Sequence, residues 1–224
     1  MSPLAQEAAD YLALRQRLGH DLAKLHISVI PICGVAFETF RKLLDPNVLG
    51  IPIAMVTDAD PPVPIDAAWK DATPESHNGI FKLSDRTKKL LDIFVGHQTV
   101  GVYSSKLTLE YDLAEASDEN AEIMAEVWEG CFDGVPGTFN RTQVKMAGPD
   151  RAAKAVAAWR GICRAKHSGS KAEFAHRLAA LLEESNNAEF CPLTFRVPRY
   201  IRDAIEYVVA RATPPTPPAG AISE

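Results

Sequence analysis

The sequence lacks the features that mark several other classes of protein. No apolar stretch approaches the roughly 20 residues of a membrane-spanning helix, and no charged-then-apolar leader opens the chain. The 4 cysteines include no C-x-x-C pair, and none of the 6 histidines is spaced as a metal pair. We therefore expect a cytoplasmic protein with reduced thiols and no membrane contact, a zinc site or disulfide being the less favoured alternative.

Each part of the chain is poor in charge of one sign. Residues 1–140 carry 11 Lys/Arg against 21 Asp/Glu, whereas residues 141–211 carry 13 against 7. An acidic part that could hold metal ions, followed by a basic part that could hold phosphate, suits a nucleic-acid enzyme. Ordinary surface charge is the plain alternative, because charge blocks this mild are common.

The spacing of apolar residues predicts an α/β fold with a parallel sheet flanked by helices. Strands are predicted at residues 27–33, 51–57 and 99–105. Helices are predicted at 4–18, 37–44, 84–94, 118–132, 150–166 and 198–211, with another opening at Ser170. We divide the chain into an α/β metal-binding domain (1–140), a basic helical lobe (141–211) and a disordered tail (212–224).

The most informative segment is Ile51-Pro-Ile-Ala-Met-Val-Thr-Asp-Ala-Asp60. Its apolar run predicts a buried parallel strand, and side chains two residues apart leave a strand on the same side. Asp58 and Asp60 would thus project together at the carboxyl end, where open α/β sheets bind ligands. Paired carboxylates suit Mg²⁺ or Mn²⁺. Alternatively, Asp58 caps the next turn and Asp60 is exposed in a loop.

Two more features point to the same chemistry. Glu110 and Asp112 follow the next strand, so these carboxylates could converge with the first pair and, without metal, raise one another's pKa values. Lys171 lies in the first turn of a predicted helix, where free N–H groups favour an anion. Carboxylates that hold divalent ions, together with a lysine, are what phosphodiester hydrolysis needs. Taken singly, each residue is better explained by an ordinary surface position, Glu110 as a solvated helix start and Lys171 as an exposed surface lysine.

The predicted helix at 150–166 has an apolar stripe and an opposite polar face. The cations on that polar face are candidate contacts for DNA phosphates: Lys154, Arg160 and Arg164.

Four segments stand out together: Val29-Ile-Pro-Ile-Cys-Gly34-Val-Ala-Phe37, Ile51 to Asp60, Thr108-Leu-Glu110-Tyr-Asp-Leu-Ala114 and Ser170-Lys171-Ala-Glu-Phe174-Ala. In order and spacing they resemble the nuclease part of the OLD-family (overcoming lysogenization defect) ATP-dependent endonucleases. That part is a Toprim domain, the metal-binding fold also found in topoisomerases and primases, followed by a helical extension. The resemblance covers about residues 10–210.

The resemblance implies a DNA endonuclease of phage defence that uses Mg²⁺ or Mn²⁺, with two metal ions in the intact family fold. By it, Asp58, Asp60 and Glu110 are metal ligands. Glu110 and Lys171 are also catalytic, the lysine acting at the scissile phosphate.

The sequence departs from the family pattern in two places. The family's first strand ends in a Val-Glu-Gly-type motif, expected here near Leu4, and Leu4-Ala5-Gln6 does not match it. We therefore expect a truncated first strand. The chain also shows no G-x-x-x-x-G-K-[ST] loop, so an ATPase would be a separately encoded partner subunit, and an oligomer is compatible with this arrangement.

Two rival functions remain. A catalytically impaired Toprim relic that serves as a DNA-binding module is favoured by the missing glutamate motif. A HAD-like phosphatase would also use a D-x-D strand, but its strand should continue into Thr/Val-rich residues. Here Asp60 runs into Pro61-Pro62-Val63-Pro64.

Overall fold

The structure is a computed structural model of the 224-residue chain. It describes residues 18–32, 36–59, 83–131, 141–163, 170–184 and 195–212. The helix predicted at 4–18 and the tail predicted beyond 212 lie almost wholly outside these ranges, as does the expected position of the first strand.

The described residues form one parallel sheet of two strands, β1 (Ile53–Thr57) and β2 (Val100–Ser104). Ile53 lies opposite Val100 and Thr57 opposite Ser104, so both strands end at the same edge. The crossover between them includes helix α3 (Asp85–Phe94), whose first turn is capped by the Ser84 hydroxyl. The predicted α/β class with a parallel sheet is confirmed.

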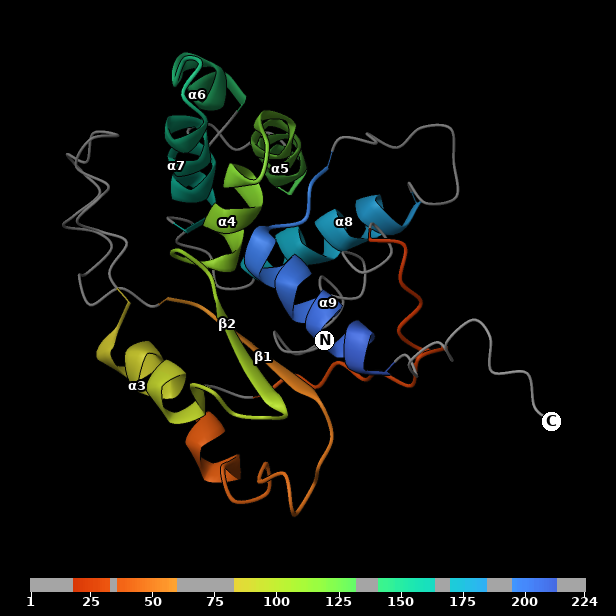
Figure 1. The fold of residues 1–224 in the computed structure, drawn as a ribbon. Coiled ribbons are helices and arrows are strands. Elements are labelled where there is room, and N and C mark those ends of the chain that lie inside the picture. Colours follow the sequence, from red (N-terminus) through yellow and green to blue (C-terminus); the bar gives the residue numbers. More distant parts are fainter. Residues whose placement is uncertain are drawn as a thin grey trace, which may run out of the picture.

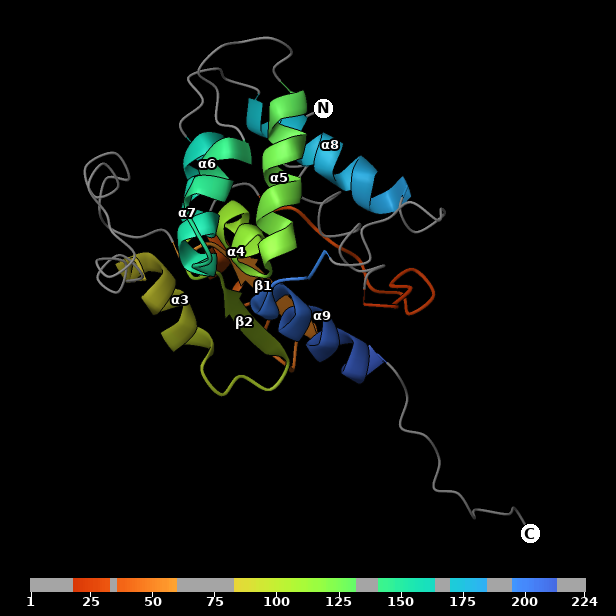
Figure 2. The same ribbon diagram turned by 90° about the horizontal axis from the view of Figure 1, so that it is seen from above.

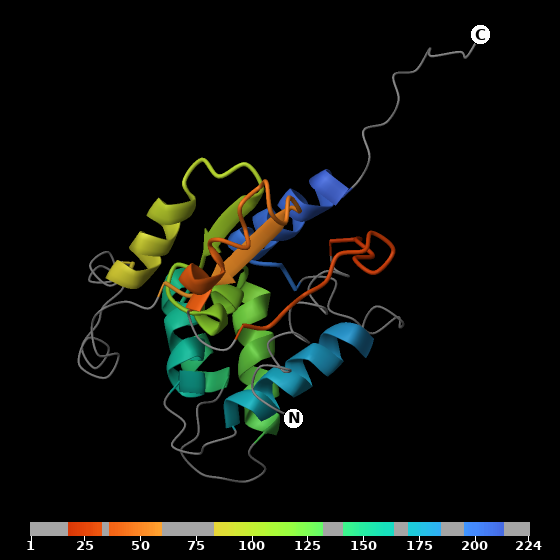
Figure 3. The same ribbon diagram turned by 90° about the horizontal axis from the view of Figure 1, so that it is seen from below.

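Helices cover both faces of this sheet. Figures 1 and 2 show α3 on one side of the strands and α9 (Arg199–Ala212) on the other, and Figure 3 shows the same order from below. A small apolar cluster fills the α3 side, with contributions from the 3₁₀ helix η1 (Ala36–Phe40). Its buried members are Phe37, Leu44, Met55, Leu90, Phe94 and Val100.

The predicted strand at 27–33 is wrong over its described residues, because 27–32 have no strand structure. Pro31 offers no N–H to a strand ladder, and Ile30 points outward with 75% of its surface exposed. The helix predicted at 37–44 is likewise reduced to η1 followed by turns, just before Pro46.

The main core is helical and stands beyond the carboxyl end of β2 (Figure 1). Its helices are α4 (Leu109–Glu115), α5 (Asp118–Gly130), α6 (Arg141–Met146), α7 (Arg151–Cys163) and α8 (Ser170–Glu184). Helix α9 also contributes, with Tyr200, Ile201 and Ile205. Helix α7 packs against both α4 and α5, and its Trp159 is almost fully buried beside Trp128 and Tyr111 in one cluster. The predicted boundary between residues 140 and 141 runs through this shared core. The division into a metal-binding domain and a basic lobe therefore stays a prediction.

None of the described helices is both long and apolar enough to cross a membrane.

Candidate active site

Asp58 is the first residue after β1, at the carboxyl edge of the sheet. Ser105, just after β2, donates its hydroxyl to Asp58 Oδ1 at 3.3 Å and accepts the Ala59 N–H at 3.1 Å. Thr87 on α3 donates to the main-chain carbonyl oxygen of Asp58 at 3.2 Å. Asp58 is therefore held by two neighbouring elements, β2 through its register and α3 through Thr87. Its carboxylate lies at the edge where open α/β sheets place ligands.

Glu110 and Lys171 are brought together from elements 61 positions apart in the sequence. Glu110 lies in the first turn of α4, and Lys171 is in the first turn of α8. Lys171 Nζ is 3.0 Å from Glu110 Oε1, the glutamate side chain being 18% exposed and the lysine side chain 55%. The two residues that the sequence singled out for catalysis are thus an ion pair on the rim of the helical core.

The Glu110 carboxyl has a pKa below its usual range. Burial pushes this pKa upward, but the Lys171 ammonium, the main-chain N–H of Glu110 itself and the Thr108 hydroxyl together outweigh burial. The expectation that clustered carboxylates raise one another's pKa values is therefore wrong for Glu110, because a cation is its nearest charged neighbour. An ionised, partly exposed carboxylate is the form in which glutamate binds a metal.

Asp112 has a different position from the one that the sequence suggested. Its carboxylate is buried and accepts the N–H groups of Lys106 at 3.0 Å and 3.1 Å and of Leu107 at 3.3 Å. Burial raises the pKa of Asp112 to about 6, although these N–H groups and the Lys106 charge work against that rise. Asp112 thus holds the loop between β2 and α4 through the N–H groups of that loop.

The donor chemistry of these residues fits a hard divalent cation, because Asp58 and ionised Glu110 each supply carboxylate oxygens. Asp60, the third predicted ligand, lies outside the described residues. Over the part of the chain that the structure describes, no group of three or more His, Cys, Asp or Glu side chains is placed to hold a metal. The convergence of all three carboxylates therefore stays a prediction.

The cations predicted to contact DNA are less open than expected. The Lys154 side chain is only 14% exposed, and its ammonium pairs with Asp118 at 3.4 Å. Arg160 is partly buried on α7, and Arg164 lies outside the described residues. Helices α5 and α7 pack against each other, so the polar face of α7 meets the acidic start of α5 at this point.

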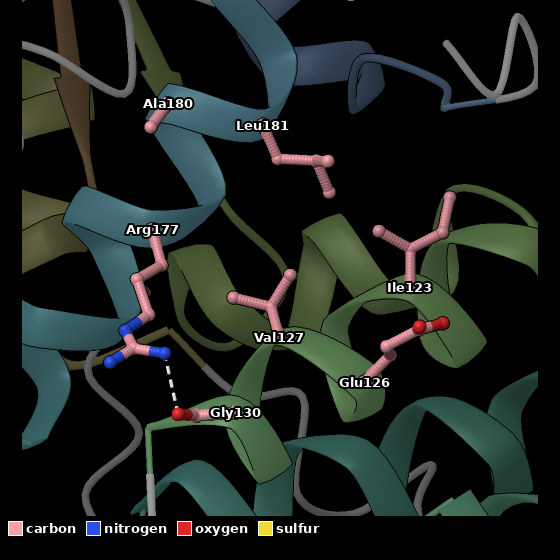
Figure 4. Close-up of a pocket in the computed structure, with 7 residues that line it drawn as sticks. All are labelled: Ile123, Glu126, Val127, Gly130, Arg177, Ala180 and Leu181. Atoms are coloured by element: carbon pink, nitrogen blue, oxygen red, sulfur yellow. Dashed lines mark hydrogen bonds between the residues drawn. The ribbon is translucent and has the colours of Figure 1, made fainter. Parts of the chain in front are cut away.

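A surface groove between α5 and α8 lies apart from these carboxylates. Figure 4 shows its lining, in which apolar side chains from both helices face one another and Arg177 donates to the carbonyl oxygen of Gly130. The lining residues are Ile123, Glu126, Val127, Gly130, Arg177, Ala180 and Leu181. None of the predicted site residues lines this groove, so it carries no part of the proposed chemistry.

Sequence reasoning missed the hydroxyl residues that hold the acidic ones. Ser105 and Thr87 hold Asp58, and Thr108 caps α4 next to Glu110. One signal was available for Thr108, since a threonine just before a helical apolar run is a typical N-cap. The partner of Ser105 could be found only from the strand register.

Comparison with known families supports the Toprim interpretation. Residues 7–60 match the family described as "Overcoming lysogenization defect protein-like, TOPRIM domain". The matched segment includes Asp58 and Asp60 and confirms the resemblance to the OLD-family Toprim domain. It supports a metal-binding, nucleic-acid-processing role. No curated protein and no solved structure matches the chain significantly.

Proposed function

Because residues 7–60 resemble the Toprim domain of OLD-like proteins, we propose that the chain is a divalent-metal-dependent DNA nuclease domain. The observation that carries the proposal is the pairing of Glu110 with Lys171 beyond the strand that neighbours Asp58. Carboxylates for metal ions and a lysine for developing charge are the groups that phosphodiester hydrolysis requires.

Asp58, Asp60 and Glu110 are the residues that would hold Mg²⁺ or Mn²⁺. A bound divalent ion neutralises phosphate charge and makes a coordinated water more acidic. Ser105 keeps the Asp58 carboxylate at the strand end, and Lys171 keeps Glu110 ionised. The exposed half of Lys171 leaves room for its ammonium to turn toward a phosphate oxygen.

The basic residues of α7 and the segment after it are the proposed contacts for the DNA backbone: Lys154, Arg160 and Arg164. A separately encoded ATPase subunit and a role in phage defence complete the proposal by the resemblance, and a cytoplasmic location completes it by the pattern of cysteines.

A DNA-binding module without catalytic activity is the second candidate. The same ion pair favours it, because Lys171 already neutralises Glu110 and the pair needs no metal to be stable.

Plasmid nicking in Mn²⁺ or Mg²⁺ tests the proposal. Lys171→Ala should lower turnover by about 10²–10³-fold while DNA affinity changes little, because the lysine is proposed to stabilise charge that develops only in the transition state. Glu110→Gln should also abolish most nicking. Lys88→Ala is the matched control, since Lys88 is also a paired helix lysine and is 54% exposed.

Nicking by the parent chain that is lost in EDTA and in both site variants supports the nuclease. A parent chain that binds DNA and does not nick it would establish the module without catalytic activity instead.

A further inference from the structure

Thr108 links the helical core to the candidate active site. It is the N-cap of α4, two residues before Glu110, and its hydroxyl oxygen accepts the Tyr111 N–H at 3.4 Å. The same oxygen accepts the indole N–H of Trp159 at 2.9 Å. Trp159 comes from the middle of α7, 51 residues further along the chain, and is 1% exposed.

The number of hydrogen bonds that a hydroxyl can make limits how the Thr108 side chain can be oriented. A threonine hydroxyl has two acceptor lone pairs and one proton to donate. Tyr111 and Trp159 supply an N–H to each lone pair, so the proton must point elsewhere. Glu110 follows this cap by two residues in the first turn of α4, so its position depends on the hydrogen bonds that hold Thr108. With both lone pairs engaged, the hydroxyl cannot turn without losing a hydrogen bond, so the two donors hold the start of α4 and the Glu110 main chain with it.

We infer that Trp159 is a positioning residue for Glu110, acting through the Thr108 hydroxyl. The inference rests on the proposed function, in which Glu110 is a metal ligand. Residues that hold a metal-ligating side chain in place, without touching the metal themselves, are commonly needed for full metal affinity. Helix α7 packs closely on α4, so the indole N–H has a fixed place from which to act.

Packing alone does not account for this contact. Trp128 is buried to the same degree in the same core, where its ring meets Phe174 edge-on at 5.7 Å between centroids. Replacing either tryptophan by phenylalanine removes a similar ring volume, whereas only Trp159→Phe removes the donor to Thr108. Trp128→Phe is therefore the matched control for lost packing.

Calorimetric titration of the full chain with Mn²⁺ tests the inference. Trp159→Phe should weaken binding by about tenfold or more, whereas Trp128→Phe should change it less than twofold. Thr108→Val should weaken binding at least as much as Trp159→Phe. The double variant should be no weaker than Thr108→Val alone, because both changes break one path. Equal affinities for the two tryptophan variants, or additive losses in the double variant, would overturn the inference.

A metal-free measurement separates this inference from the proposed function. The chain has 3 tryptophans, and Trp159→Phe identifies the Trp159 indole N–H signal in a ¹H–¹⁵N spectrum. Glu110→Gln should shift that signal and leave the Trp128 signal in place. If the Trp159 signal shifts but the parent chain does not bind Mn²⁺, the positioning role is supported and the proposed metal-dependent function is refuted. Mn²⁺ binding without a shift, and with full affinity in Trp159→Phe, refutes the positioning role alone.

Discussion

Replacing Asn120 by alanine should strongly destabilise the fold. This fully buried amide donates to the carbonyl oxygens of Leu113 at 2.7 Å and Arg196 at 2.8 Å. It accepts the Arg196 N–H at 2.8 Å and the Ser117 hydroxyl at 3.0 Å. The side chain thereby fastens the segment before α9 to the end of α4, the helix that carries Glu110.

The magnitude follows from the groups left behind in Asn120→Ala. The variant leaves the Leu113 carbonyl and both main-chain groups of Arg196 without this partner, and each buried unpaired group costs about 1–3 kcal/mol. Partial hydration near the exposed Arg196 reduces the sum, so we expect a loss of about 3–5 kcal/mol in the free energy of unfolding.

Urea denaturation followed by circular dichroism measures that loss. Asn47→Ala is the control, since Asn47 is an exposed turn residue whose side chain bonds Asp45 in a local contact at 3.1 Å. A loss below about 1 kcal/mol in Asn120→Ala, or one equal to that of the control, would show that the amide does not hold these segments together.

Two further predictions concern charge. DNA binding should weaken steeply as salt rises, and alanine at Lys154, Arg160 and Arg164 should flatten that dependence; Lys154 should contribute least, because it is paired with Asp118. An unchanged salt dependence in a filter-binding assay would contradict this. In EDTA, the free energy of unfolding should fall by about 2 kcal/mol between pH 4 and pH 6, because the folded protein holds the Asp112 proton up to a pKa of about 6 rather than 3.8. Asp112→Asn should remove that fall, and an identical pH profile in the variant would be inconsistent with this account.

Much of the regular structure could be predicted from residue spacing. Strands β1 and β2 and helices α3, α7 and α9 lie close to their predicted ranges, because each has an apolar period that matches its own geometry. The strand predicted at 27–33 is wrong over its described residues, because Pro31 interrupts the apolar run and removes a ladder donor.

The sequence blocks of charge were a poorer guide to packing. Residues before and after 140 share the main core, which contains Trp128 and Trp159. Lys154 of α7 also pairs with Asp118 of α5. Net charge reports composition over a stretch of chain and carries no information about which faces of two helices meet.

The candidate site was predicted in part. Asp58, Glu110 and Lys171 were singled out from their positions after strands or at a helix start, and from the family resemblance. The direct Glu110–Lys171 pair and the Trp159–Thr108 hydrogen bond depend on distant elements. No local pattern could distinguish Trp159 from Trp128 as the donor.

The most direct test of the central claim is a calorimetric titration of Mn²⁺ into the parent chain, Asp58→Ala and Asp92→Ala. Asp92 is an exposed aspartate on α3 and serves as the control for lost negative charge. If carboxylates at the sheet edge hold the metal, Asp58→Ala should weaken Mn²⁺ binding by at least about tenfold, and Asp92→Ala should leave it unchanged. Equal Mn²⁺ affinity in the parent chain and Asp58→Ala would contradict the assignment of a metal site to this edge.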